Sequence, residues 1–126
     1  MMWKEVVAMA IVENQKDRVN MIMNEIVYSM KDVFGGNLRQ VILFGSYARG
    51  EQVEYSDMDV MVLVNLSDEE LSQYNNAIAE VTTDISIKYG VLPSIIDKNY
   101  EHFHHWVPFV PFYRNVQIEG VEFYAS

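Results

Sequence analysis

The sequence predicts a single α/β domain in which a small mixed β-sheet packs against helices. Three observations support this class. Stretches with apolar residues every three or four positions alternate with short runs that are entirely apolar. Hydrophobic residues make up 50% of the 126-residue chain, which is enough to form one core. No repeat, low-complexity tract or Pro/Gly/Ser-rich linker divides the chain, so we expect one domain over residues 1–126.

The first half of the chain predicts one helix and two strands. A helix is expected over about residues 14–34, ended by the Gly-Gly-Asn sequence at 35–37. Its apolar residues recur at helical spacing: Val19, Ile22, Met23, Ile26, Val27 and Met30. Residues 41–44 and 60–64 are apolar throughout, as expected of strands that are covered on both faces.

The second half predicts three helices and one more strand. Ser67 is a typical N-cap, and the acids that follow it favour the first turn of a helix that runs to about Lys88. Tyr89 and Gly90 are expected to end that helix. The remaining predicted elements are a strand at 91–96, helices at 99–106 and 109–118, and an extended segment at 121–124. This order of elements is typical of an α/β sandwich with a mixed sheet.

Composition excludes several classes of function. Eighteen acids against nine Lys and Arg give a net charge of −9, which repels a phosphate backbone, so we expect no direct binding of nucleic acid. A basic partner or a metal-bound small molecule suits this charge better. The lack of cysteine excludes disulfides and thiolate metal sites. Neither a signal peptide nor an apolar run of about 20 residues is evident, so we expect a cytoplasmic protein with no membrane contact.

A glycine-serine turn follows the first predicted strand. Gly45 lets the main chain approach a ligand closely, and backbone N–H groups together with the Ser46 hydroxyl can hold phosphate oxygens there. Arg49 is a further candidate for phosphate contact. A surface ion pair between Arg49 and a neighbour such as Glu51 is the alternative. Gly45 and Ser46 are therefore predicted to bind phosphate, and for Arg49 both interpretations stay open.

Two acids stand at the start of the second predicted strand. Asp57 and Asp59 are two positions apart, so in a strand both carboxylates point to the same face. Two carboxylates this close repel unless a cation lies between them. A lone Asp-x-Asp is more often a cap or a solvated edge, but its combination with the Gly-Ser turn favours a Mg²⁺ site that also ligates nucleotide phosphates.

The stretch "GSYARGEQVEYSDMD", in which ten residues separate Gly-Ser from Asp-x-Asp, resembles the nucleotidyltransferase superfamily that includes DNA polymerase β, and within it the minimal nucleotidyltransferases (MNT). The C-terminal "PFYRNVQIEGVEFYA" is also similar to free-standing MNT proteins. The resemblance implies a polymerase β-like nucleotidyltransferase fold. It also implies that Gly45 and Ser46 contact the β- and γ-phosphates of ATP, and that Asp57 and Asp59 bind Mg²⁺ and take part in catalysis.

The resemblance also implies a partner. MNT proteins of this type are typically antitoxins of a HEPN-domain toxin, to which they are thought to transfer AMP from ATP onto a tyrosine. The acidic charge suits a basic RNA-cleaving partner. One alternative is a weakly active or inactive binding module that neutralises its partner by masking it. Another is a stand-alone transferase for a small molecule.

One departure from the family pattern puts catalysis in question. Active members usually carry a third carboxylate in the middle of the strand after the long helix, where this chain has Leu92, Pro93 and Ser94. Asp97 is the nearest acid, and we expect it at the end of the strand, capping the helix from Asn99. Pro93 predicts an edge position or a bulge, because proline cannot donate to the ladder.

The last third of the chain is rich in His and aromatic residues. His102 and His105 are three positions apart on a predicted helix, yet no carboxylate nearby completes a metal site, so we interpret them, with His104, as helix-surface or interface residues. The aromatic residues are too many for a short exposed tail: Trp106, Phe109, Phe112, Tyr113, Phe123 and Tyr124. We expect part of this cluster in the core and part at an interface, which allows a homo-oligomer.

Overall fold

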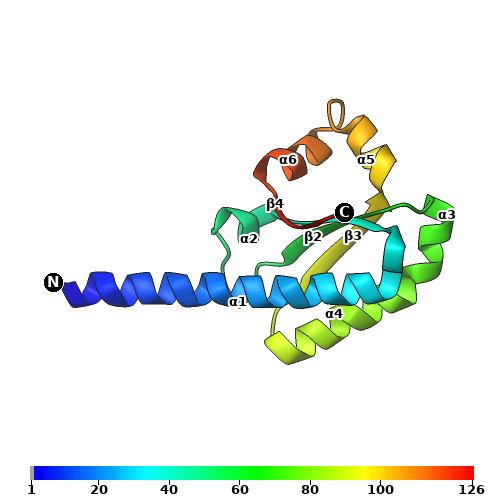
Figure 1. Cartoon of the computed structure of the whole chain (residues 1–126). Coiled ribbons are helices and arrows are strands. Elements are labelled where there is room, and N and C mark those ends of the chain that lie inside the picture. Colours follow the sequence, from blue (N-terminus) through cyan, green and yellow to red (C-terminus); the bar gives the residue numbers. More distant parts are fainter. Residues whose placement is uncertain (1) are drawn as a thin grey trace.

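The computed structural model describes residues 2–126, except for the side chains of residues 8 and 10–13. Four strands form one sheet in the order β3-β2-β1-β4 (Figure 1). Strand β1 (Leu38–Phe44) pairs antiparallel with β2 (Met58–Val64) and with β4 (Val121–Ala125). Strand β3 (Pro93–Asn99) runs parallel to β2. The predicted mixed sheet is therefore confirmed.

Helices cover both faces of the sheet. Helices α1 (Met2–Phe34) and α4 (Asn75–Tyr89) lie on one face, and α5 (Tyr100–Trp106) and α6 (Pro111–Glu119) lie on the other (Figure 1). Alternate side chains of each central strand point to opposite faces. The cluster on the α1/α4 face takes Val41, Leu43, Val60, Val62 and Val64 from the sheet. The cluster on the α5/α6 face takes Ile42, Phe44, Met61 and Leu63. Two covered faces explain why residues 41–44 of β1 and 60–64 of β2 are apolar throughout.

Helix α1 is longer than the sequence predicted. It begins at Met2 instead of near Asn14, and its N-terminal part extends beyond the rest of the domain (Figure 1). The prediction depended on the apolar stripe that packs on the sheet, and that stripe starts only at Val19. In the N-terminal part, the described side chain of Trp3 is 80% exposed. The 3-10 turn η1 (Gly35–Asn37) follows α1, as the Gly-Gly-Asn sequence predicts.

The single helix predicted after Ser67 is interrupted. Ser67 caps α3 (Asp68–Leu71) as predicted, and both bonds of a capping box with Glu70 are present. A 3-10 turn, η2 (Ser72–Tyr74), then separates α3 from α4. Ser, Gln, Tyr and Asn form this part of the chain, and all but Gln are weak helix formers. The ring centroids of Tyr74 and Phe34 are 4.8 Å apart, and this contact holds the turn against the end of α1.

Strand β3 is shifted along the chain from its predicted position. It starts at Pro93 on the edge of the sheet, so the predicted edge position of Pro93 is confirmed. Asp97 lies within the strand, and the prediction that it caps the next helix is wrong. Asn99 caps α5 instead, because its Oδ1 accepts a hydrogen bond from the His102 N–H at 2.8 Å. The strand continues past Ile96 because its ladder with β2 extends to Val64.

None of the helices that the structure describes has the length and apolarity that a membrane span needs.

Candidate functional site

The predicted phosphate-binding turn is the short helix α2 (Gly45–Arg49), which starts directly after β1. Gly45 has φ +73°, in the left-handed region that favours glycine. A Cβ atom at this position would lie 2.3 Å from Oδ2 of Asp59. Gly45 is therefore needed both for the backbone conformation and for the space that the Asp59 carboxylate occupies. The turn and the second acid of the motif are in direct contact.

Replacing Gly45 with Ala should destabilise the fold more than replacing Gly50. Both glycines have positive φ, so either Ala substitution costs about 1–2 kcal/mol of backbone strain. Only at Gly45 must the Asp59 carboxylate also move, since no heavy atom lies within 4 Å of a Cβ built on Gly50. Urea unfolding of Gly45→Ala and Gly50→Ala measures the difference. Equal losses of unfolding free energy in the two variants would show that the Asp59 carboxylate does not limit the space at Gly45.

The two acids lie near each other but in different settings. Asp59 pairs with Phe44 across the β1–β2 ladder and shares the α5/α6 face with Met61. Asp57 immediately precedes β2 and is exposed, so only one of the two carboxylates belongs to the strand itself. Burial raises the pKa of Asp59, and the negative charge of Asp57 raises it further, while the Arg49 guanidinium acts in the opposite direction.

This electrostatic setting fits a divalent cation. Burial and a second acid both disfavour the ionised form of a carboxylate. A cation that prefers oxygen ligands, such as Mg²⁺, stabilises that ionised form. Among the residues that the structure describes, no three His, Asp or Glu side chains group closely enough to hold a metal ion. Asp57 and Asp59 would therefore share the ion with oxygens from outside the chain, such as those of a triphosphate. The roles of Gly45, Ser46 and these acids stay predictions.

Arg49 is held by two carboxylates. Its Nε donates to Glu51 Oε2 at 3.1 Å, and its Nη1 donates to Glu119 Oε2 at 3.2 Å. Both bonds raise the pKa of Arg49. The alternative interpretation of Arg49, an ion pair with Glu51, therefore describes this structure, and phosphate contact stays a prediction. The sequence gives no local signal for Glu119, because 70 positions separate it from Arg49.

The raised pKa of Asp59 makes stability depend on pH in the metal-free protein. The folded state binds the Asp59 proton more tightly than the unfolded chain, so this group favours the fold at low pH and opposes it once ionised. Asp59→Asn should therefore be more stable than the wild type at neutral pH. The difference in free energy of unfolding between Asp59→Asn and the wild type should narrow as the pH falls towards 3.8, the ordinary pKa of Asp. Urea unfolding across this range, with chelator present, tests the sign. If Asp59→Asn is no more stable than the wild type at neutral pH, the predicted effect of Asp59 on stability is wrong.

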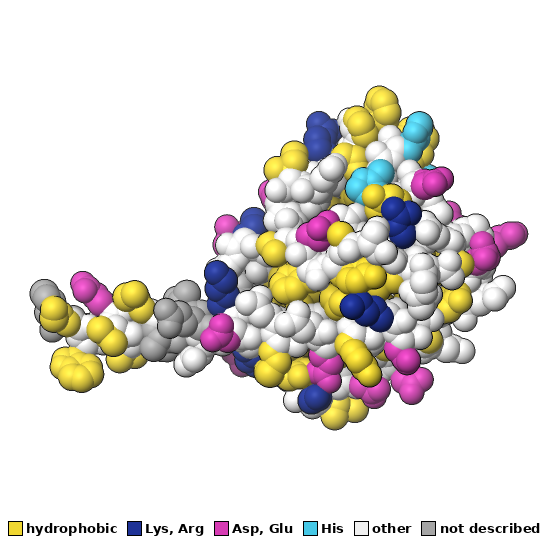
Figure 2. Space-filling view, viewed as in Figure 1, with side chains coloured by type: hydrophobic (Ala, Val, Ile, Leu, Met, Phe, Trp, Pro, Cys, Tyr) yellow, Lys and Arg dark blue, Asp and Glu magenta, His cyan; other side chains and the backbone are white. Residues whose placement is uncertain are grey.

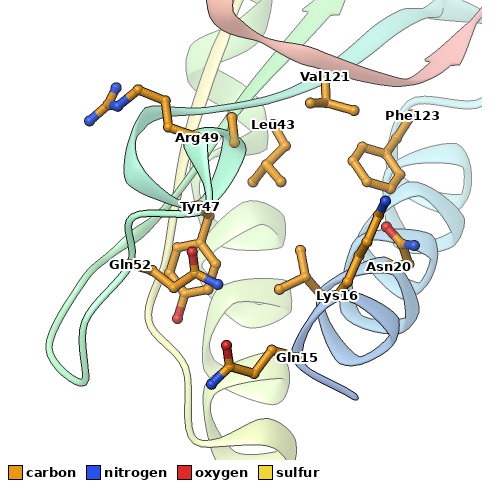
Figure 3. A pocket seen from close by; sticks show the side chains of 12 residues that line it. Gln15, Lys16, Asn20, Leu43, Tyr47, Arg49, Gln52, Val121 and Phe123 are labelled. Atoms are coloured by element: carbon orange, nitrogen blue, oxygen red, sulfur yellow. The ribbon is translucent and has the colours of Figure 1, made fainter. Parts of the chain in front are cut away.

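A separate cavity of about 370 Å³ lies between α1, α2 and β4 (Figure 3). Its floor includes Leu43, which belongs to the α1/α4 face, so the cavity is on the other side of the sheet from Asp59. Figure 3 shows the Arg49 side chain turned away from it. Its polar lining residues include Gln15, Lys16, Asn20 and Gln52, besides Tyr47 and Arg49 of α2. The predicted metal site is thus not in this cavity.

Histidine and hydrophobic side chains gather at the end of the domain that α5 and α6 form (Figure 2). His102 and His105 are exposed, which agrees with their interpretation as helix-surface residues. His104 is partly buried, where its Nε2 lies 3.0 Å from Gln40 Oε1, and burial lowers its pKa. The predicted aromatic cluster is divided, because Phe109 is 68% exposed, while Tyr113, Phe123 and Tyr124 are partly buried against the two core clusters. A homo-oligomer through this end stays a prediction.

Comparison with known proteins identifies related sequences. The family model described as "Nucleotidyltransferase domain" matches residues 23–118. A protein of Methanocaldococcus jannaschii that carries the name "Putative protein adenylyltransferase" is 32% identical over 98 residues. The match covers 78% of this chain and 90% of that protein.

Two solved structures share the fold. A chain in a toxin-antitoxin structure with AMP-PNP has 21% identity and a TM-score of 0.57, over 82% of this chain and 73% of that one. A chain in the structure of a tri-AMPylated Shewanella oneidensis HEPN toxin in complex with an MNT antitoxin has 18% identity and a TM-score of 0.52, over 84% and 71%. At these identities the likeness concerns the fold alone.

Proposed function

Because this chain belongs to the nucleotidyltransferase domain family, we propose that it transfers AMP from magnesium-bound ATP to a protein hydroxyl. The name of the Methanocaldococcus jannaschii relative supports a protein as the acceptor. The structural neighbour with AMP-PNP, an ATP analogue, supports ATP as the donor. The observation that carries the proposal is the contact between Gly45 and Asp59, which brings the glycine-serine turn against an acid that is costly to ionise.

Each predicted residue has a role in this reaction. Backbone N–H groups at Gly45 and the Ser46 hydroxyl hold oxygens of the β- and γ-phosphates. Asp57 and Asp59 hold Mg²⁺, which when bound offsets the charge that develops on the phosphates. The acceptor oxygen forms a bond to the α-phosphorus, the bond to the β-phosphate oxygen breaks, and pyrophosphate leaves. Arg49 can exchange its carboxylate partners for phosphate oxygens as the nucleotide enters.

Asp97 should have no part in the transfer. It pairs with Val62 in the parallel ladder, three positions beyond the pairing of Ser94 with Asp59, so it lies about 10 Å further along the sheet. It also points to the opposite face from Asp59. Asp97→Ala should therefore transfer AMP at the wild-type rate, measured as label from α-labelled ATP on the acceptor. Loss of transfer in this variant would overturn the placement of Asp97.

The proposed acceptor is a tyrosine of a HEPN-type toxin, which makes this protein its antitoxin. Both solved neighbours described above come from toxin-antitoxin complexes, and one of them contains an AMPylated HEPN toxin. The net charge of −9 suits a basic partner, and it disfavours direct contact of this protein with the RNA that the toxin cleaves. A HEPN-type reading frame beside the gene would support this assignment.

A second candidate function is neutralisation by masking, without chemistry. It is favoured by strand β3, which places Ser94 and no acid beside Asp59. Co-expression of the HEPN-type toxin with wild type or with Asp57→Ala separates the two. Under the transferase proposal, Asp57→Ala binds the toxin but fails to neutralise it, and the toxin carries no AMP by mass spectrometry. Full neutralisation by Asp57→Ala would favour masking. A stand-alone transferase for a small molecule would leave the toxin unmodified in both cases.

A further inference from the structure

A hydroxyl that attacks phosphorus must give up its proton. A general base accepts that proton and must lie within hydrogen-bond distance of the hydroxyl. Strand β3 offers no such group, since Ser94 is the residue paired with Asp59. Asp97 is on the wrong face, because it pairs with Val62, whose side chain packs on the α1/α4 side. Asp57 and Asp59 are needed for the cation. A base supplied by this chain must therefore come from another element.

Helix α6 places an acid at the same end of the sheet. Glu119 is its last residue, and Val116, one turn earlier, is buried against the α5/α6 face. Val121 pairs with Leu43, so the chain at Glu119 lies next to the start of α2. Gly120 fixes this approach, because a Cβ there would lie 2.4 Å from Cγ2 of Ile42. In Figure 1, α6 lies above and to the right of α2, and the two helices are in contact. Glu119 is thus held on the face that carries Asp59.

The ion pairs of Arg49 connect Glu119 to the predicted site. Arg49 Nη1 lies 3.2 Å from Glu119 Oε2, and the Arg49 charge also acts on Asp59. The Glu119 side chain is 45% exposed, so an acceptor can reach it. Glu51, the other partner of Arg49, is 66% exposed in the irregular segment that follows Gly50. A base is most effective on a rigid element, which favours the helical Glu119 over Glu51.

We propose that Glu119 is the general base of the transfer reaction, and this inference rests on the proposed function. As the phosphates attract Arg49, the Glu119 carboxylate is released from its ion pair. It takes the proton of the acceptor hydroxyl while the acceptor oxygen bonds to the α-phosphorus and pyrophosphate leaves with the electron pair of the broken bond. The C-terminal helix thus supplies the carboxylate that β3 lacks.

The test uses the full chain, Mg²⁺, α-labelled ATP and, as acceptor, the HEPN-type toxin of the proposed function. Glu119→Gln keeps the shape of the side chain but cannot accept the proton, so kcat should fall by about 100- to 10,000-fold. Calorimetric affinity for Mg-ATP should stay near that of the wild type. Glu51→Gln is the matched control, because it removes the other carboxylate from Arg49, and its kcat should be unchanged.

A second comparison separates a base from a residue that only positions Arg49. In an Arg49→Ala background, a positioning role predicts no further effect of Glu119→Gln, whereas a base predicts a further loss of at least about tenfold. Formate, a small carboxylate, should restore part of the activity of Glu119→Ala. If the wild type transfers AMP and Glu119→Gln does so equally well, the inference is wrong while the proposed function stands. A wild type that labels no acceptor overturns both.

Discussion

Replacing Asp57 and Asp59 together with Asn is expected to abolish the magnesium-dependent binding of ATP. Asn keeps the size of each side chain but removes the negative charges that would hold the cation. A loss of about 3 kcal/mol of this attraction already weakens binding about 100-fold. Calorimetric titration with ATP, with and without Mg²⁺, measures the effect. Wild-type binding should require the metal.

The matched control removes the same charge elsewhere. Asp17 and Asp84 are exposed acids on α1 and α4, remote from the α5/α6 face, and Asp17→Asn with Asp84→Asn changes the net charge equally. This control should bind Mg-ATP like the wild type. If the Asp57/Asp59 double variant also binds Mg-ATP as tightly as the wild type, the proposed metal site is wrong.

Truncation of Phe103 is expected to cause the largest loss of stability. Phe103 is fully buried in the cluster on the α5/α6 face, where its ring centroid lies 4.9 Å from that of Tyr113 on α6. Phe103→Ala should lower the free energy of unfolding by about 3–5 kcal/mol, because a buried aromatic ring leaves a cavity. Phe109→Ala, at a site that is 68% exposed, should cost less than about 1 kcal/mol. Urea unfolding of the two variants checks this, and similar losses would contradict the packing described.

The sequence predicted those elements whose signals are local. The apolar runs at 41–44 and 60–64 indicated strands covered on both faces, and two separate clusters now account for them. Ser67 marked a helix start because its capping box needs only neighbours three positions away. Gly90 marked a helix end, and its φ of +68° is the conformation that glycine favours there.

What the sequence did not predict depends on tertiary contacts. Helix α1 starts at Met2, ahead of the stripe that packs on the sheet, so periodicity could not find its beginning. The register of β3 against β2, which places Asp97 on the far face, is set by pairing between distant segments. Glu119 meets Arg49 only because β4 returns to pair with β1. The motif that supplies Gly45 and Asp59 was predictable, but the ion pair that Glu119 of α6 makes with Arg49 was not.

The most direct test of the proposed function compares ATP labelled at the α-phosphate with ATP labelled at the γ-phosphate. Each is incubated with the protein, Mg²⁺ and the HEPN-type partner, and label on the partner is followed by gel and by mass spectrometry. We expect α-label on a tyrosine, no γ-label, and no label from either nucleotide with Asp57→Ala. Transfer of γ-label, or neutralisation of the toxin without any label, would contradict adenylyl transfer.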